Sequence, residues 1–94
     1  MTPDQEIHLG NRAAEVLQNE AYIQAFDAIN SEIVKQWTSA PARDVDGRER
    51  LWLMQSLLSK LQITLESMMS SGKLKVADMR HKQSLLERSK DWLR

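Results

Sequence analysis

The chain has 94 residues, with 13 basic and 13 acidic side chains and no cysteine. This length provides for one small domain, and the lack of cysteine excludes disulfides, thiolate catalysis and cysteine-ligated metals. The charge is uneven, because residues 1–72 carry 6 basic and 10 acidic side chains whereas residues 73–94 carry 7 and 3. Net charges of −4 and +4 predict two surfaces of opposite sign, which favour head-to-tail contacts or an acidic partner.

The N-terminal segment predicts a helix over residues 3–18. Thr2 is a suitable N-cap, Pro3 suits the first helical position and Gln5 completes a capping box. Gly10 lies in the middle of this helix and is expected to weaken it by about 1 kcal/mol relative to alanine.

A second helix is predicted over residues 19–38, with Asn19 as its N-cap. Its apolar side chains recur at helical spacing: Tyr22, Ala25, Phe26, Ile29, Ile33 and Trp37. Asn19 alone need not break a helix, so the first two helices could also form one bent rod. The loop before Asp46 contains Pro41 and is short, which predicts that the second and third helices pack antiparallel as a hairpin.

The third helix is predicted over residues 46–71, with Gly72 as its C-cap. Its apolar side chains alternate at steps of three and four: Leu51, Met54, Leu58, Leu61, Leu65 and Met68. Such a heptad seam needs a partner helix. Trp52 lies beside the seam and makes a second side of the helix apolar, so we expect these seven residues to include the interface of a homo-oligomer. The fold is therefore predicted to be all-α, a helical hairpin or small bundle over residues 1–72.

Residues 73–94 are predicted to form a basic C-terminal helix or docking tail. The docking residues would be Lys73, Lys75, Arg80, Lys82, Arg88, Lys90 and Trp92. The segment could be an ordinary charged helix face or dock on an acidic protein, and contact with nucleic acid phosphates is the weaker alternative. If this segment were instead a fourth core helix, its seven-residue repeat of Met79, Leu86 and Leu93 would be buried.

No motif that carries enzymatic or metal chemistry is present. Asp44 and Asp46 resemble the start of a calcium loop, but Ser56 stands where a bidentate glutamate is required, so helix capping is the better interpretation. His8 and His81 have no zinc-site spacing. We expect no enzyme activity, no cofactor and no bound metal.

Three arginines lie around the loop and the start of the third helix: Arg43, Arg48 and Arg50. They could grip a phosphate or carboxylate. The alternative is an ordinary solvated face, paired with the neighbouring acids Asp44, Asp46 and Glu49.

Apolar runs are too short to cross a bilayer, and the acidic N-terminal segment does not suit a secretory signal, so a cytosolic protein without a membrane partner is expected.

Residues 12–74 resemble short helical proteins encoded by tailed bacteriophages and prophages, often near head and DNA-packaging genes. The residues that carry the resemblance are Arg12-Ala13-Ala14, Asn19, Trp37, Arg48-Glu49 and the stretch from Leu65-Glu66 to Gly72-Lys73. The resemblance implies a bacteriophage setting, in the host cytoplasm or the virion, more than a molecular activity. The heptad seam, the uneven charge and the lack of catalytic groups lead us to expect a non-enzymatic protein that acts by self-association and helix-mediated protein binding, in virion assembly or as a minor virion component. The alternatives are a regulator that binds a host protein and a DNA-packaging accessory.

Overall fold

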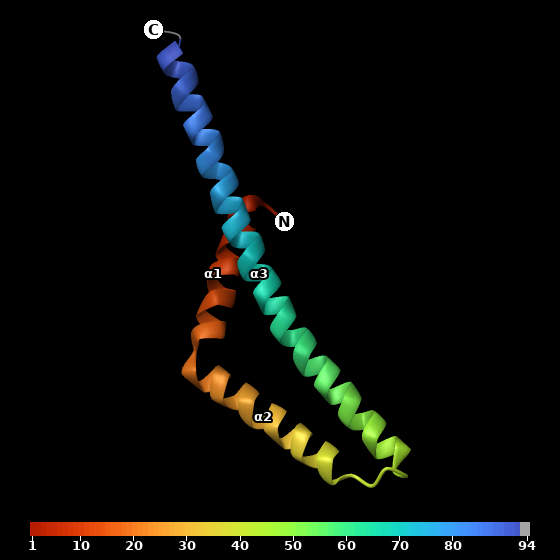
Figure 1. The fold of residues 1–94 in the computed structure, drawn as a ribbon. Coiled ribbons are helices and arrows are strands. Elements are labelled where there is room, and N and C mark those ends of the chain that lie inside the picture. The colour runs from red at the N-terminus through yellow and green to blue at the C-terminus, as the bar shows by residue number, and fades with distance from the viewer. Residues whose placement is uncertain (93–94) are drawn as a thin grey trace.

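A computed structural model describes residues 1–92 of the chain, and the side chains of residues 1–89. Its elements are α1 (Pro3–Gln18), α2 (Glu20–Ser39) and α3 (Val45–Trp92), and this part of the chain contains no strand (Figure 1). The all-α prediction is therefore confirmed.

The N-termini of α1 and α2 form as the sequence predicts. The backbone N–H of Gln5 donates to Thr2 Oγ1 at 3.2 Å, and that of Thr2 donates to Gln5 Oε1 at 3.0 Å, which completes the capping box. Asn19 is extended, with φ −69° and ψ 123°, and its Oδ1 accepts from the backbone N–H of Tyr22 at 3.0 Å. The two helices are thus separate and meet at an elbow at Asn19 (Figure 1), and the bent-rod alternative is wrong.

The predicted end of the third helix is wrong. α3 does not stop at residue 71, because it continues through Gly72 to Trp92 without interruption, so residues 73–92 extend α3 and form no separate fourth helix. One internal glycine costs a helix only about 1 kcal/mol, and the lysine, leucine, alanine and arginine residues that follow are good helix formers. At the other end, Asp44 caps α3, since its Oδ1 accepts from the backbone N–H of Gly47 at 3.1 Å.

α1 crosses α3 where two glycines meet. A Cβ atom added to Gly10 would lie 2.9 Å from the Cα of Gly72 and 2.9 Å from the carbonyl oxygen of Met68, so the two backbones touch. Ala13, on the next turn of α1, is buried. Small residues at a crossing allow this approach. Gly10 therefore positions α1 on α3, a role that its place in the sequence does not predict.

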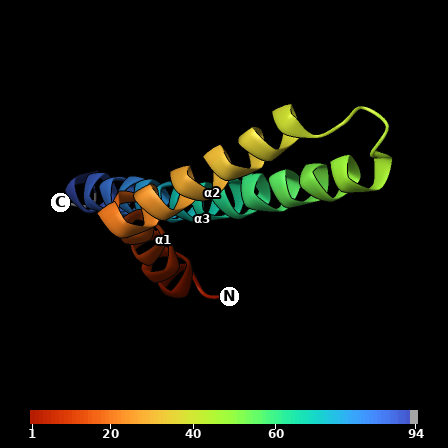
Figure 2. The ribbon, with the colours of Figure 1, turned by 90° about the horizontal axis from the view of Figure 1, so that it is seen from below.

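α2 runs antiparallel to α3, as predicted, but packs against it less extensively than α1 does (Figures 1 and 2). Near the loop, Ile33 of α2 and Leu51 of α3 are both buried. Toward the elbow, the hydroxyl of Tyr22 reaches the Oε1 of Gln62 at 3.0 Å. The hairpin thus pairs α3 with a first arm that consists of α1 and α2 and bends at Asn19.

The molecule is long and thinly packed, with extents of 77 × 25 × 19 Å and a radius of gyration of 21.3 Å. A compact chain of this length would have a radius of about 12 Å. Only Ala13, Ile33 and Leu51 are buried apolar residues among those described. None of the three helices, over residues 1–92, combines the length and apolar character needed to cross a membrane.

Candidate protein-binding surfaces

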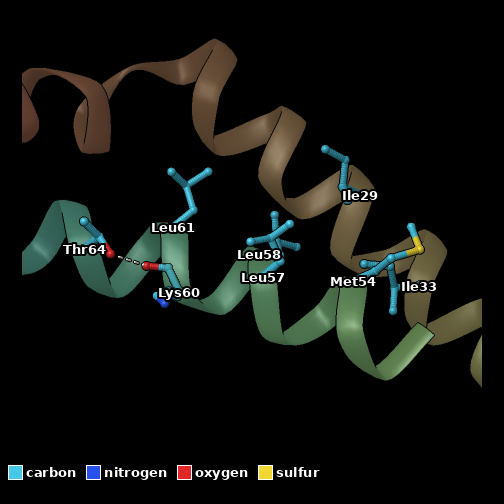
Figure 3. A pocket seen from close by; sticks show the side chains of 8 residues that line it. All are labelled: Ile29, Ile33, Met54, Leu57, Leu58, Lys60, Leu61 and Thr64. Carbon is cyan, nitrogen blue, oxygen red and sulfur yellow. Dashed lines mark hydrogen bonds between the residues drawn. The ribbon is translucent and has the colours of Figure 1, made fainter. Parts of the chain in front are cut away.

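An apolar groove lies between α2 and α3. Its lining comes from Ile29 and Ile33 on α2 and from Met54, Leu57, Leu58, Lys60, Leu61 and Thr64 on α3 (Figure 3). The groove encloses about 500 Å³. Thr64 adds little polarity, because its hydroxyl donates to the Lys60 carbonyl oxygen at 2.7 Å within the helix. The groove therefore offers an almost purely apolar surface.

The structure divides the predicted seam between several environments. Met54, Leu58 and Leu61 line the groove, whereas Leu51 is buried and Leu65 is half-buried. Met68 lies in a hollow with Met1 and Leu9 of the N-terminal segment. α1 and α2 thus cover part of the seam within one chain, and the groove is the part they leave open.

Trp52 lies away from the groove, in a shallow hollow with Val34 and Trp37. Gln55 also lines this hollow, and its buried side-chain oxygen has no hydrogen-bond partner. An unsatisfied buried acceptor is uncommon in folded proteins. This hollow is therefore a second place where α2 and α3 are incompletely packed.

One arginine of the predicted cluster, Arg48, is engaged in contacts within the chain. The guanidinium of Arg48 lies over the ring of Trp37, with its central carbon 4.4 Å from the ring centroid, and donates to the Ala40 carbonyl oxygen at 3.4 Å. This cation–π contact attaches the loop end of α2 to α3. Arg43 and Arg50 are exposed.

The basic residues of the predicted docking tail follow α3 beyond Gly72. Lys75 pairs with Glu6 of α1 at 3.7 Å, and Lys82 pairs with Asp78 one turn earlier at 3.1 Å. Lys73 and Arg80 line a hollow beside the glycine crossing, and Arg88 is exposed. Lys90 and Trp92 belong to the last turns of α3, and their side chains lie outside the described residues.

The fourth-core-helix alternative is wrong for two of its three residues. Met79 and Leu86 are exposed, because α1 begins at Pro3 and the described residues 1–92 form no further helix that covers the end of α3. Leu93 lies outside the described residues.

A second apolar line, which the heptad spacing does not reveal, follows α3 away from its crossing with α1 and is bordered by α2 only at Trp52. We use "outer face" for the surface that carries Trp52, Ile63, Leu74 and Leu85, all of which are exposed. The available signal was their spacing of eleven residues, about three helical turns. A search for heptads alone does not detect it.

In the described part of the chain, no three or more His, Cys, Asp or Glu side chains lie close enough together to hold a metal ion. His8 on α1 and His81 on α3 are both exposed.

Comparisons with protein-family models, curated proteins and solved structures found no match. The functional argument therefore depends on the surfaces described above.

Proposed function

We propose that this protein acts without catalysis, by associating with itself and by binding a helix of another protein during assembly of a tailed-bacteriophage particle. The groove between α2 and α3 is the observation that carries the proposal. Two helices flank an open apolar trough of about 500 Å³, lined by Ile29, Met54, Leu57 and Leu61. A trough of this kind suits the apolar face of an amphipathic helix.

The surface area supports association independently. The chain exposes 7814 Å², whereas a compact monomer of its mass, 10.9 kDa, exposes about 5,600 Å². Obligate interfaces bury roughly 1,000–2,500 Å² on each partner, which is similar to this surplus. One chain thus carries about as much extra surface as a permanent partner would cover.

The bacteriophage setting is supported by the resemblance over residues 12–74. In that setting the protein would be made in the host cytoplasm and act in virion assembly or remain as a minor virion component. Its partner would be another phage protein.

The test is copurification of the protein with procapsids or particles from infected cells, together with sedimentation of the purified chain. Leu57→Glu would place a charge in the groove, where Leu57 is exposed and makes little contribution to the fold, and should abolish retention on particles. Val16→Glu is the matched control, because Val16 is an exposed apolar residue of α1 outside the groove, and this variant should be retained.

Failure of the wild-type chain both to associate and to copurify would refute the proposal. Stable recovery of a host protein would replace it with the regulator alternative. A salt-sensitive mobility shift of DNA would replace it with the packaging accessory, because phosphate contacts weaken steeply with salt.

A further inference from the structure

The outer face of α3 carries four exposed apolar side chains, and α2 borders it at its start, where Trp52 shares a hollow with Val34 and Trp37. Trp52, Ile63, Leu74 and Leu85 are 59%, 63%, 70% and 48% exposed. Because eleven residues make about three turns, these four side chains form a line nearly parallel to the helix axis. α1 crosses α3 at Gly72, which is buried, whereas Ile63, Leu74 and Leu85 stay exposed and accessible to a second helix.

This line is symmetric about its midpoint. Trp52 and Leu85 are equally distant from a point between residues 68 and 69, and so are Ile63 and Leu74. Two copies of α3 that lie antiparallel about this point would bring Trp52 against Leu85 of the second copy. Ile63 would meet Leu74 of the second copy.

Small residues lie next to the midpoint on this face. Ser67 and Ser70 are both exposed, and their short side chains would allow two helices to approach closely. The contact could extend along α3, which has 48 residues and a length of about 72 Å.

The charges that flank the line have the same symmetry. Glu49 and Arg88 are equally distant from the midpoint, and Lys60 and Asp78 are within one residue of being so. All four side chains are exposed. In the antiparallel arrangement Lys60 would face Asp78 of the second copy, a complementary pair that occurs twice, and Glu49 would lie across the contact line from Arg88 of the second copy. A parallel arrangement would instead place two segments of net charge +4 side by side, which is unfavourable.

We infer that the second copy of this chain packs on the outer face, with the two α3 helices antiparallel and a two-fold axis between residues 68 and 69. The inference depends on the self-association proposed above and specifies its surface and geometry. It leaves the groove between α2 and α3 free for a different protein.

The first test compares three substitutions by sedimentation equilibrium of the full chain. Leu74→Glu and Ile63→Glu would each bury an unpaired charge twice in the dimer, so the dissociation constant should rise about a hundredfold or more. Leu57→Glu is the matched control, because Leu57 is 71% exposed on the same helix but lies in the groove. This control should leave the dissociation constant unchanged.

Folding can be checked separately, because Ile63 and Leu74 face solvent and circular dichroism should give the wild-type helix content for both variants. If Leu57→Glu dissociates the dimer and the other two variants do not, the groove is the self-association surface. That result overturns this inference and leaves the proposed self-association intact. A wild-type chain that stays monomeric at high micromolar concentration overturns both.

The second test determines the orientation with single cysteines, which the natural chain lacks. Ser56 and His81 lie one turn inside Trp52 and Leu85 and are equally distant from the midpoint. Mixing Ser56→Cys with His81→Cys should give the mixed disulfide under mild oxidation. Predominant disulfides between two Ser56→Cys chains would indicate parallel helices and overturn the inference.

Discussion

The crossing of α1 over α3 at Gly10 and Gly72 predicts that alanine at Gly10 will not stabilise the protein, although alanine usually stabilises a helix relative to glycine. Alanine in place of an unpacked glycine stabilises a helix interior by about 1 kcal/mol. At this crossing, however, the Cβ of Gly10→Ala would meet two backbone atoms of α3 at 2.9 Å, and backbone cannot move aside as a flexible side chain can. The helices would have to separate.

Overpacking of this kind costs about 1–3 kcal/mol. After the gain in helix propensity, Gly10→Ala should lower the free energy of unfolding by about 0–2 kcal/mol. Gly72→Ala should cost less, because its Cβ would lie 3.0 Å from the Cα of Gly10 and 3.3 Å from the Glu6 carbonyl oxygen. A loss of 1 kcal/mol corresponds to a fall of about 4–8 °C in Tm for a domain of this size.

Urea unfolding followed by circular dichroism measures these differences. All variants are compared at one protein concentration, because the proposed self-association would add to stability. Gly47→Ala is the control, since its Cβ would meet only the mobile carboxylate of Asp44. The gain in propensity and the disturbance of the Asp44 cap are each about 1 kcal/mol and should nearly cancel. If Gly10→Ala and Gly72→Ala both stabilise the protein by about 1 kcal/mol, the close crossing does not exist.

Three further outcomes are expected. Ile33→Ala should lower the free energy of unfolding by about 2–5 kcal/mol in urea titrations, because Ile33 is one of the few buried side chains, and a change below 1 kcal/mol would contradict that burial. Asn19→Ala should cost about 1 kcal/mol in the same titrations through loss of the α2 cap, and a neutral effect would show that the cap is not needed. Deletion of residues 81–94 should leave the helix content per residue unchanged. Deletion of residues 73–94 should in addition weaken the packing of α1 on α3, because it removes Lys75, the ion-pair partner of Glu6. Equal thermal unfolding of the two truncated chains would contradict this difference.

The starts of the helices were predicted well, because a helix cap is formed by a side chain and a backbone N–H only a few residues apart. The first helix was predicted over residues 3–18 and α1 has the same bounds, because Thr2 and Gln5 form a capping box that depends on neighbouring residues alone. Asn19 was identified as a cap for the same reason. The loop-side cap was narrowed to two candidates, and the structure selects Asp44 over Asp46.

Contacts between distant segments could not be predicted in the same way. The approach of Gly10 to Gly72 joins residues far apart in the sequence, and a glycine inside a helix looks like a weakness until its partner is known. The groove has a similar origin. Apolar spacing placed Leu58 and Leu61 on one face of α3, but the direction in which α2 leaves the elbow at Asn19 decides whether that face is covered.

The continuity of α3 was nevertheless present in the sequence. The heptad positions occupied by Leu51, Leu58 and Leu65 continue without a change of phase through Gly72 to Met79 and Leu86. A new helix after a C-cap has no reason to resume the register of the old one, so this unbroken phase favours a single helix over two. Glycine identity alone favoured a cap at residue 72, and the register of the residues on both sides was the stronger signal. α2 lies beside Leu51 and Leu58 of this register and α1 crosses it at Gly72, whereas Met79 and Leu86 lie past the crossing and are exposed.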